Sequence, residues 1–303
     1  MDKAFIESCR SFIEPNRFRL DEPMKLHTTF KIGGPADCLI FPASMEETER
    51  ILALVKEHDL PLTILGNGSN VLVQDGGIRG VVVKFARPMA QIHCEGNRII
   101  ASSGALLKDV SEAAAENALT GLEFACGIPG SIGGALFMNA GAYDGEMKNV
   151  ADRVCTVDDS GRVHHYGRES LDLGYRHSVF QKNGEAIVEV ELLLEAGDEQ
   201  EIRAKMEDFT NRRESKQPIE MPSAGSTFKR PTGYFAGTLI DQTGLKGLTV
   251  GGAQVSKKHA GFVVNIGDAT AADIRGLIRE VQKRVFAKHG VKLYPEVRII
   301  GEP

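Results

Sequence analysis

Residues 127–142 read Gly-Ile-Pro-Gly-Ser-Ile-Gly-Gly-Ala-Leu-Phe-Met-Asn-Ala-Gly-Ala, and this stretch decides the fold. Five glycines fall within it, and the residues between them are mostly small or apolar. Glycine loses more backbone freedom on folding than any other residue, so this density indicates a chain that lies against something or bends where a Cβ would clash. A flexible linker would be polar. The stretch therefore predicts a buried loop along a large, flat ligand, and the alternative is a tight turn packed into a core.

A second glycine loop follows a short apolar run at residues 62–65. It reads Gly66-Asn67-Gly68-Ser69-Asn70 and leads into a second apolar run at residues 71–73. Consecutive backbone N–H groups in such a loop can converge on an anion, and the Ser and Asn side chains add donors. A pyrophosphate is the expected guest. The alternative is an ordinary Asn-Gly hairpin turn.

A third glycine-containing segment, Ala101-Ser102-Ser103-Gly104-Ala105, leaves a predicted strand and enters a predicted helix. We expect N–H groups there to point at negative charge as well. The common nucleotide-binding motifs are missing: position 71 is Val, so G-x-G-x-x-G is incomplete, and no G-x-x-x-x-G-K-[ST] occurs. A bound dinucleotide would therefore be held by a fold other than the Rossmann or P-loop folds.

Composition limits the functional classes. The chain has 303 residues, of which 42% are hydrophobic and 25% charged, as in a globular protein with two or three domains. The net charge of −5 removes the electrostatic drive for nucleic-acid binding. No run of eighteen apolar residues and no apolar signal core occurs, so we expect no membrane insertion. Five scattered cysteines without C-x-x-C spacing indicate reduced thiols in the cytoplasm and no metal site.

Strands and helices follow one another irregularly, which predicts an α+β fold rather than a doubly wound parallel sheet. Residues 44–47, Ser-Met-Glu-Glu, have the pattern of a capping box. Helices are predicted at residues 44–58, 106–119, 198–216, 234–243 and 270–289. Strands are predicted at residues 62–65, 71–73, 81–83, 91–95, 98–101, 153–157, 162–166, 186–194, 262–266, 291–293 and 297–299. We place a domain boundary near residue 197, with a ligand-binding region over 1–197 (subdomains of about 1–70 and 71–197) and a C-terminal domain over 198–303.

Three polar clusters follow the glycine loops. They are Gly-Tyr-Arg-His-Ser at 174–178, Ala-Gly-Ser-Thr-Phe-Lys-Arg-Pro at 224–231, and Tyr-Pro-Glu-Val-Arg at 294–298. Each combines cationic, hydroxyl or carboxyl groups that could carry chemistry. The alternatives are a surface turn, a helix cap and a strand edge, since such residues are common in loops.

Six segments in order resemble the UDP-N-acetylenolpyruvoylglucosamine reductase family, and together they run nearly end to end. They are residues 27–34, 65–70, 127–135, 175–176, 225–229 and 295–298. The resemblance implies a flavoprotein with an FAD-binding domain of the vanillyl-alcohol-oxidase type over 1–197 and a smaller α+β substrate domain over 198–303. The family's longer form covers its substrate with a tyrosine. No tyrosine occurs between Tyr175 and Tyr234, so this chain resembles the shorter form, and the covering group is left open.

The resemblance also implies how FAD is held without a covalent bond. Its pyrophosphate would meet residues 67–70, and its isoalloxazine and ribityl chain would run along residues 127–134. The cofactor-binding residues expected in this way are Asn67, Gly68, Ser69, Asn70, Gly104, Ala105, Gly127, Ile128, Pro129, Gly130, Ser131, Gly133, Gly134, Asn139 and Gly141.

The implied reaction uses NADPH as hydride donor and converts UDP-N-acetylglucosamine enolpyruvate to UDP-N-acetylmuramate. Hydride addition to the vinyl carbon leaves negative charge on its neighbour, so the site needs cationic or hydrogen-bonding groups and a proton donor. Arg176 suits the first task, because a guanidinium can hold a carboxylate with two hydrogen bonds. Glu296 would donate to the enolate oxygen as a neutral acid. Ser226 matches the family's proton donor, and we expect Lys229 or a water molecule to polarise it.

Partners follow from the same resemblance. Lys216, Lys229, Arg230, Lys246 and Arg298 could bind the UDP diphosphate or the carboxylate; the alternative is ordinary surface ion pairs. We expect small-molecule substrates, no nucleic acid, no membrane insertion and a monomer in the cytoplasm. The pathway would be cell-wall biogenesis, with effects on cell shape, cell cycle and division. Two other functions stay open: an FAD-dependent oxidase or dehydrogenase of the same fold class acting on an alcohol or hydroxy acid, and a non-enzymatic nucleotide-binding sensor.

Overall fold

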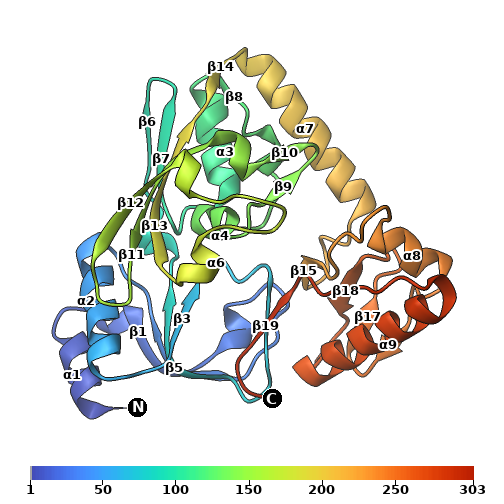
Figure 1. Cartoon of the computed structure of the whole chain (residues 1–303), viewed down its shortest axis with the longest axis horizontal. Coiled ribbons are helices and arrows are strands. Elements are labelled where there is room, and N and C mark those ends of the chain that lie inside the picture. The colour runs from blue at the N-terminus through green and yellow to red at the C-terminus, as the bar shows by residue number, and fades with distance from the viewer. Residues whose placement is uncertain (1) are drawn as a thin grey trace. The chain divides into compact units, whose positions relative to one another are not determined.

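The computed structural model describes residues 2–303, and it divides into two compact units, whose parts Figure 1 labels. The first unit contains the chain up to Leu20, Cys38–Asn67 and Gly80–Arg212. The second contains Asp21–Asp37, Gly68–Arg79 and Arg213–Pro303. Both units mix helices with strands, in agreement with the predicted α+β class. The division into functional domains near residue 197 stays a prediction.

Helices occur in both units. They are α1 (Lys3–Arg10), α2 (Met45–Glu57), α3 (Leu107–Glu116), α4 (Ile132–Phe137), α5 (Met147–Val150), α6 (Phe180–Asn183), α7 (Glu199–Lys216), α8 (Ala236–Gln242) and α9 (Ala271–His289). Among residues 2–303, none of them combines the length and the apolar character needed to cross a bilayer.

Two larger sheets lie wholly or mostly in the first unit. One is antiparallel, with the order β12 (Val163–Gly167), β11 (Ala151–Val157), β13 (Ala186–Leu193), β7 (Arg98–Ser102) and β6 (Ile92–Glu95). The other has the order β1 (Phe18–Pro23), β2 (Pro35–Ile40), β5 (Ile78–Lys84) and β3 (Leu62–Leu65). Two short antiparallel pairs are β9 (Gly141–Ala142) with β10 (Gly145–Glu146), and β8 (Leu119–Thr120) with β14 (Glu195–Ala196).

The second unit has a four-stranded antiparallel sheet. Its order is β15 (Ser223–Ser226), β18 (Phe262–Asn265), β17 (Ala253–Val255) and β16 (Thr249–Val250). A parallel pair joins β19 (Arg298–Ile300) to β4 (Val71–Val73). Residues of α9, such as Ile274 and Leu277, are buried with Val263 of the sheet and form the core of this unit.

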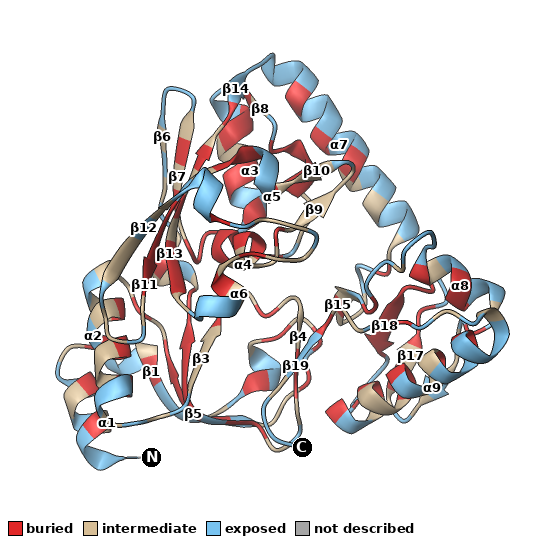
Figure 2. Ribbon diagram, viewed as in Figure 1, coloured by how far each residue is buried: buried red, intermediate tan, exposed pale blue. Residues whose placement is uncertain are grey.

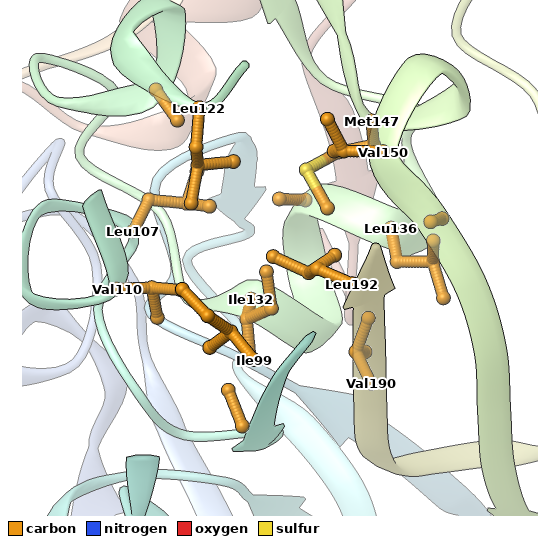
Figure 3. Packing of buried hydrophobic residues seen from close by; sticks show 14 of the residues in the cluster. Ile99, Leu107, Val110, Leu122, Ile132, Leu136, Met147, Val150, Val190 and Leu192 are labelled. Atoms are coloured by element: carbon orange, nitrogen blue, oxygen red, sulfur yellow. The ribbon is translucent and has the colours of Figure 1, made fainter. Parts of the chain in front are cut away.

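The core of the first unit anchors the glycine-rich stretch. Figure 3 shows Leu107 of α3, Ile132 and Leu136 of α4 and Leu192 of β13 around one apolar centre, and all four are fully buried. In the burial view of Figure 2, α4 is largely buried. Truncating such a leucine to alanine costs about 2–5 kcal/mol. The backbone that leads into α4 is therefore held firmly from one side.

Most predicted helices and strands are confirmed within a few residues, and two expectations are corrected. The helix predicted at 106–119 ends at Glu116, and Ala118 adopts a left-handed φ of 53° that turns the chain. The strand predicted at 291–293 is wrong. Leu293 is buried in the second core, and its carbonyl accepts a hydrogen bond from Gln282 Nε2 (2.9 Å) instead of a strand partner.

The predicted capping box of α2 forms only in half. Ser44 Oγ accepts from the Glu47 N–H (3.2 Å), as expected. The Glu47 carboxylate, however, accepts from the Ala43 N–H (2.8 Å) and pairs with Arg17 (2.5 Å). With its oxygens engaged by the Arg17 guanidinium and the Ala43 N–H, the Glu47 carboxylate does not make the reciprocal bond of the box. The Arg17 guanidinium holds the pKa of Glu47 below its usual value.

Candidate active site

The loop Gly66–Asn70 joins β3 to β4 without making a hairpin. β3 pairs in parallel with β5, and β4 pairs in parallel with β19, so the hairpin alternative is wrong. Gly68 has a φ of +72°, and an added Cβ would overlap the backbone carbonyl of His27. Only glycine combines that conformation with so close an approach, so this position is required by the path of the loop.

The loop presents unused hydrogen-bond donors. In the described chain, none of the backbone N–H groups from Gly66 to Asn70 donates to a protein acceptor, whereas the carbonyls of Gly68 and Asn70 accept from Thr29 N (3.2 Å) and Arg298 N (3.0 Å). Gly68 is buried and its neighbours are half-buried. Consecutive backbone N–H groups without a protein acceptor can converge on an anion, so the loop suits an anionic ligand.

The segment 101–105 behaves in the opposite way. The N–H groups of Ser103, Gly104 and Ala105 donate to Val188 (2.9 Å), Met89 (2.7 Å) and Ser102 (2.9 Å). The expectation that they point at an anion is therefore wrong. An added Cβ on Gly104 would lie 2.6 Å from the Met89 carbonyl oxygen, so this glycine permits close packing of the chain on itself. A cofactor contact of Gly104 and Ala105 stays a prediction, without the donors that motivated it.

Ser131 stands where the two glycine loops meet. It precedes α4, and its Oγ is buried and has no hydrogen-bond partner within residues 2–303. An added Cβ on Gly66 would lie 2.5 Å from this oxygen. Asn67 Nδ2 also donates to the Pro129 carbonyl (2.7 Å). The first unit thus brings Gly66 and Asn67 together with the glycine-rich stretch at 127–142, around one hydroxyl that still needs a partner.

These features fit a phosphorylated cofactor. A buried hydroxyl left without a partner costs about 1–3 kcal/mol, so Ser131 Oγ suits a polar ligand atom as its partner. The glycines near Ser131 differ in what an added Cβ would contact. An added Cβ on Gly134 would be only in ordinary contact with Ser131 Oγ (3.5 Å), whereas on Gly133 it would overlap the Ser103 side chain. The tight-packing alternative therefore holds for Gly133 and Gly66, whose added Cβ would overlap a serine side chain, and the ligand interpretation suits Gly134.

Arg176 lies in a tight turn of the first unit. The turn Gly174–His177 is closed by reciprocal N–H···O bonds of 3.1 Å, and Arg176 has a φ of +53°. This conformation costs a non-glycine residue about 1–2 kcal/mol. Such strain persists only where the surroundings impose it, and it is typical of functional positions.

Two side-chain amides hold this turn. Gln181 Nε2 donates to the Arg176 carbonyl (3.0 Å), and Asn139 Nδ2 donates to the Gly174 carbonyl (2.9 Å). Asn139 is buried, and its amide also donates to Glu146 (2.9 Å) and accepts from the Lys148 N–H (2.9 Å). Its predicted contact with the cofactor stays a prediction. The contact from Gln181 was not predicted, because a glutamine five residues after an arginine has no recognisable spacing signal.

In the second unit, Ser226 and Glu296 lie on neighbouring segments. Phe228 forms an antiparallel bridge with Pro295, the Glu296 N–H donates to the Thr227 carbonyl (2.8 Å), and the Lys229 N–H donates to the Tyr294 carbonyl (2.8 Å). Ser226, at the end of β15, is exposed. The structure therefore brings together two of the three predicted catalytic residues, whereas Arg176 belongs to the first unit.

The predicted phosphate-binding cations differ from one another. Lys246 forms an exposed ion pair with Asp241 (2.9 Å), as the surface-pair alternative expects. Arg230 lies over the Phe235 ring, 4.0 Å from its centroid. Lys216, Lys229 and Arg298 are exposed. Their roles in substrate binding stay predictions.

Comparison with known proteins identifies the family of the chain. A family model described as "FAD binding domain" matches residues 36–167, and one described as "UDP-N-acetylenolpyruvoylglucosamine reductase, C-terminal domain" matches residues 217–300. The UDP-N-acetylenolpyruvoylglucosamine reductase of Clostridium perfringens (strain SM101 / Type A) is 54% identical over 297 residues, which cover 98% of this chain and 97% of the relative.

Solved structures extend the comparison. The UDP-N-acetylenolpyruvylglucosamine reductase of Thermus caldophilus superposes with a TM-score of 0.81 at 37% identity, covering 94% of this chain and 98% of that one. An alkyldihydroxyacetonephosphate synthase gives a TM-score of 0.52 at 16% identity, covering 65% and 41%, which shows a shared fold alone.

The fold and the glycine-loop site define an FAD-dependent oxidoreductase with an FAD-binding domain and a distinct C-terminal domain. Within that class, the chain belongs to the UDP-N-acetylenolpyruvoylglucosamine reductase family. The predicted family, fold class and flavin cofactor are confirmed.

Proposed function

We propose that this enzyme uses NADPH to reduce UDP-N-acetylglucosamine enolpyruvate to UDP-N-acetylmuramate in peptidoglycan precursor synthesis. The observation that carries the proposal is the meeting of two glycine loops at the unpaired Ser131 hydroxyl, in a chain that matches this family over 98% of its length. The alternative oxidase or dehydrogenase acting on an alcohol is not favoured, because the relatives that match nearly the whole chain are named as reductases.

The residues present suit FAD. The unused N–H groups of Gly66–Asn70 would receive its pyrophosphate, and Ser131 Oγ would form a hydrogen bond with one of its polar atoms. Gly134 has no side chain that would fill the space beside that hydroxyl. When bound, FAD would supply the chemistry of hydride transfer between NADPH and the substrate.

The chain's own groups would act on the substrate. Arg176 holds its carboxylate with two charge-assisted hydrogen bonds and stabilises the negative charge that develops there. Ser226 gives a proton to the carbon next to the one that receives the hydride, and Glu296 donates to the enolate oxygen. Lys229, three residues after Ser226, polarises the serine hydroxyl.

The cations Lys216, Arg230 and Arg298 would bind the diphosphate, and Lys246 would have to leave Asp241 to join them. We further propose that the protein works as a monomer in the cytoplasm, where its free cysteines stay reduced. Through the supply of peptidoglycan precursor, its activity would affect cell shape, the cell cycle and division.

Ser226→Ala tests the assignment by separating the two half-reactions. We expect flavin reduction by NADPH to keep its rate, whereas flavin reoxidation by the enolpyruvyl nucleotide slows by about a hundredfold or more, because only that step needs the proton donor. Stopped-flow absorbance of the flavin measures both rates. Ser223→Ala, at the other end of β15, is the matched control and should change neither. Equal slowing of both half-reactions by Ser226→Ala would contradict the proposed role.

A further inference from the structure

The turn that presents Arg176 is strained, so something must hold it. Arg176 sits at the third position of a four-residue turn with a φ of +53°, where glycine is the usual residue. Without support, an arginine in such a turn would relax to a negative φ. The guanidinium would then lose its direction relative to a substrate carboxylate.

We infer that Gln181 is a positioning residue for Arg176, and that it links the arginine to α4, the helix that begins directly after Ser131. The inference rests on the proposed function, in which Arg176 holds the substrate carboxylate. Gln181 Nε2 donates to the Arg176 carbonyl (3.0 Å) and to the Phe137 carbonyl (2.8 Å). Phe137 is the last residue of α4, whose first turn follows Ser131. The Gln181 side-chain amide therefore joins the end of α4 to the turn that contains Arg176.

The position of Gln181 is itself fixed. It belongs to α6, where the neighbouring Phe180 is fully buried and packs edge-on against Tyr166, with ring centroids 5.1 Å apart. Ser178 Oγ also donates to the Phe137 carbonyl (2.8 Å), so the turn and α6 are both attached to the end of α4. Since both donors of the Gln181 amide are used and its helix is anchored, the side chain acts as a rigid brace rather than a solvated group.

The other end of the turn has its own support. Asn139, two residues after α4, donates to the Gly174 carbonyl (2.9 Å) and is held by Glu146 and Lys148. The turn is thus held at both ends from the same region of the chain. Removing the Gln181 hydrogen bonds alone should leave the turn attached, but the Arg176 guanidinium would be less precisely oriented toward the substrate carboxylate. This predicts slower substrate reduction in a folded, FAD-containing protein.

Gln181→Met is the primary test, since it keeps the side-chain length and removes both donors. We expect flavin reoxidation by the enolpyruvyl nucleotide to slow by about tenfold to a hundredfold, the usual effect of a small misplacement of a substrate-binding group. FAD content and the rate of flavin reduction by NADPH should stay unchanged. Asn183→Ala is the control: it removes a hydrogen bond to Tyr166 (3.2 Å) from the same helix without touching the turn, and should change neither half-reaction. Equal slowing of both half-reactions by Gln181→Met, or loss of FAD, would overturn the positioning role.

A double-mutant cycle with Arg176→Ala completes the test. If Gln181 acts through the arginine, adding Gln181→Met to Arg176→Ala should slow reoxidation no further. Independent, multiplicative effects would overturn the inference. If Arg176→Ala alone does not slow reoxidation, the proposed role of Arg176 fails, which is a different result from a normal Gln181→Met. Should Gln181→Met not fold, Gln181→Glu, which keeps the shape but replaces the donors with acceptors, is judged by the same criteria.

Discussion

Two glycine-containing segments of the first half of the chain look alike in sequence and differ in the structure. In Gly66–Asn70 no backbone N–H donates to a protein acceptor, within the part of the chain that is described. In Ser103–Ala105 every N–H donates to a carbonyl. Both segments need glycine because a Cβ would collide with the protein. An added Cβ on Gly68 would overlap the His27 carbonyl, and one on Gly104 would overlap the Ala86 carbonyl.

The difference shows that glycine content alone does not identify a ligand loop. What distinguishes the two segments is the use of their backbone donors, since a buried N–H without a partner is costly unless a ligand or water accepts from it. We therefore assign cofactor binding first to Gly66–Asn70 together with Ser131, and packing to Ser103–Ala105. Each of the following predictions could break or sharpen this contrast.

Gly68→Ala should have the largest effect, on FAD binding. A left-handed Cβ costs about 1–2 kcal/mol, and the collision with His27 adds about 1–3 kcal/mol, so the loop should refold locally. We expect FAD affinity to fall on the order of a thousandfold, measured by flavin fluorescence titration. The control is Gly184→Ala, which has the same φ of +72° but open space around it. Comparable losses of FAD affinity in the two variants would contradict the account.

Lys84 tests how the strand before the loop Gly66–Asn70 is packed. It is buried and pairs across the sheet with Leu65, the residue before that loop. Burial lowers the pKa of Lys84 to about 8. Below that pH the folded state holds a disfavoured charge, so the stability of the FAD-free protein should rise as pH increases from 8 to the ordinary lysine value of about 10.4. The difference in free energy of unfolding between Lys84→Met and wild type should therefore change with pH, moving in favour of wild type as the pH rises from about 8 to about 10.4.

Urea unfolding of wild type and Lys84→Met across this pH range measures the difference directly, which cancels the titration of other groups. Lys108→Met, at an exposed position of α3, is the control and should shift stability by less than about 0.5 kcal/mol. A stability difference between Lys84→Met and wild type that does not change over this pH range would contradict the lowered pKa of Lys84.

Gly104→Ala should change stability rather than cofactor affinity. The added Cβ meets the carbonyls of Ala86 and Met89, so overpacking should lower the free energy of unfolding of the FAD-free protein by about 2 kcal/mol. Calorimetry and FAD titration of the same sample separate the two quantities. An unchanged melting temperature with a large loss of FAD affinity would place the cofactor against this segment after all.

Ser131→Ala should have the smallest effect, and its sign is informative. Removing a buried hydroxyl that lacks a partner should leave the FAD-free protein equally stable or more stable by up to about 1 kcal/mol, while FAD affinity falls about tenfold. Ser111 is the matched control, since it is equally buried but donates to the Leu122 carbonyl (3.2 Å). Ser111→Ala should lower stability and leave FAD affinity unchanged. Destabilisation of the FAD-free protein by Ser131→Ala would mean that its hydroxyl already has a partner.

Features with local signals could be predicted from the sequence. The predicted helix at 270–289 and the predicted strands at 91–95 and 98–101 are confirmed as α9, β6 and β7. Their determinants, the Thr270–Asp273 capping box and the short connection between the two antiparallel strands, lie within a few residues. The glycine loops were recognised for the same reason. The strands β1 and β2 were not predicted.

The candidate site depends on contacts between distant segments, which is why much of it could not be predicted. The link from Asn67 to Pro129 spans 62 residues, and that from Gln181 to Phe137 spans 44. The unpaired Ser131 hydroxyl is visible only in the folded structure. The same holds for whether the backbone N–H groups of each loop already donate hydrogen bonds within the protein. The resemblance of short motifs located the loops, but it did not indicate which of their backbone groups are available to a ligand.

Hydrogen–deuterium exchange of the backbone amides, with and without FAD, tests the central claim most directly. The account predicts that FAD slows exchange at Gly66–Asn70, whose donors gain an acceptor, and leaves Ser103–Ala105 unchanged, since those amides are already bonded. If Gly66–Asn70 exchanges equally fast when FAD is bound, the loop does not hold the cofactor.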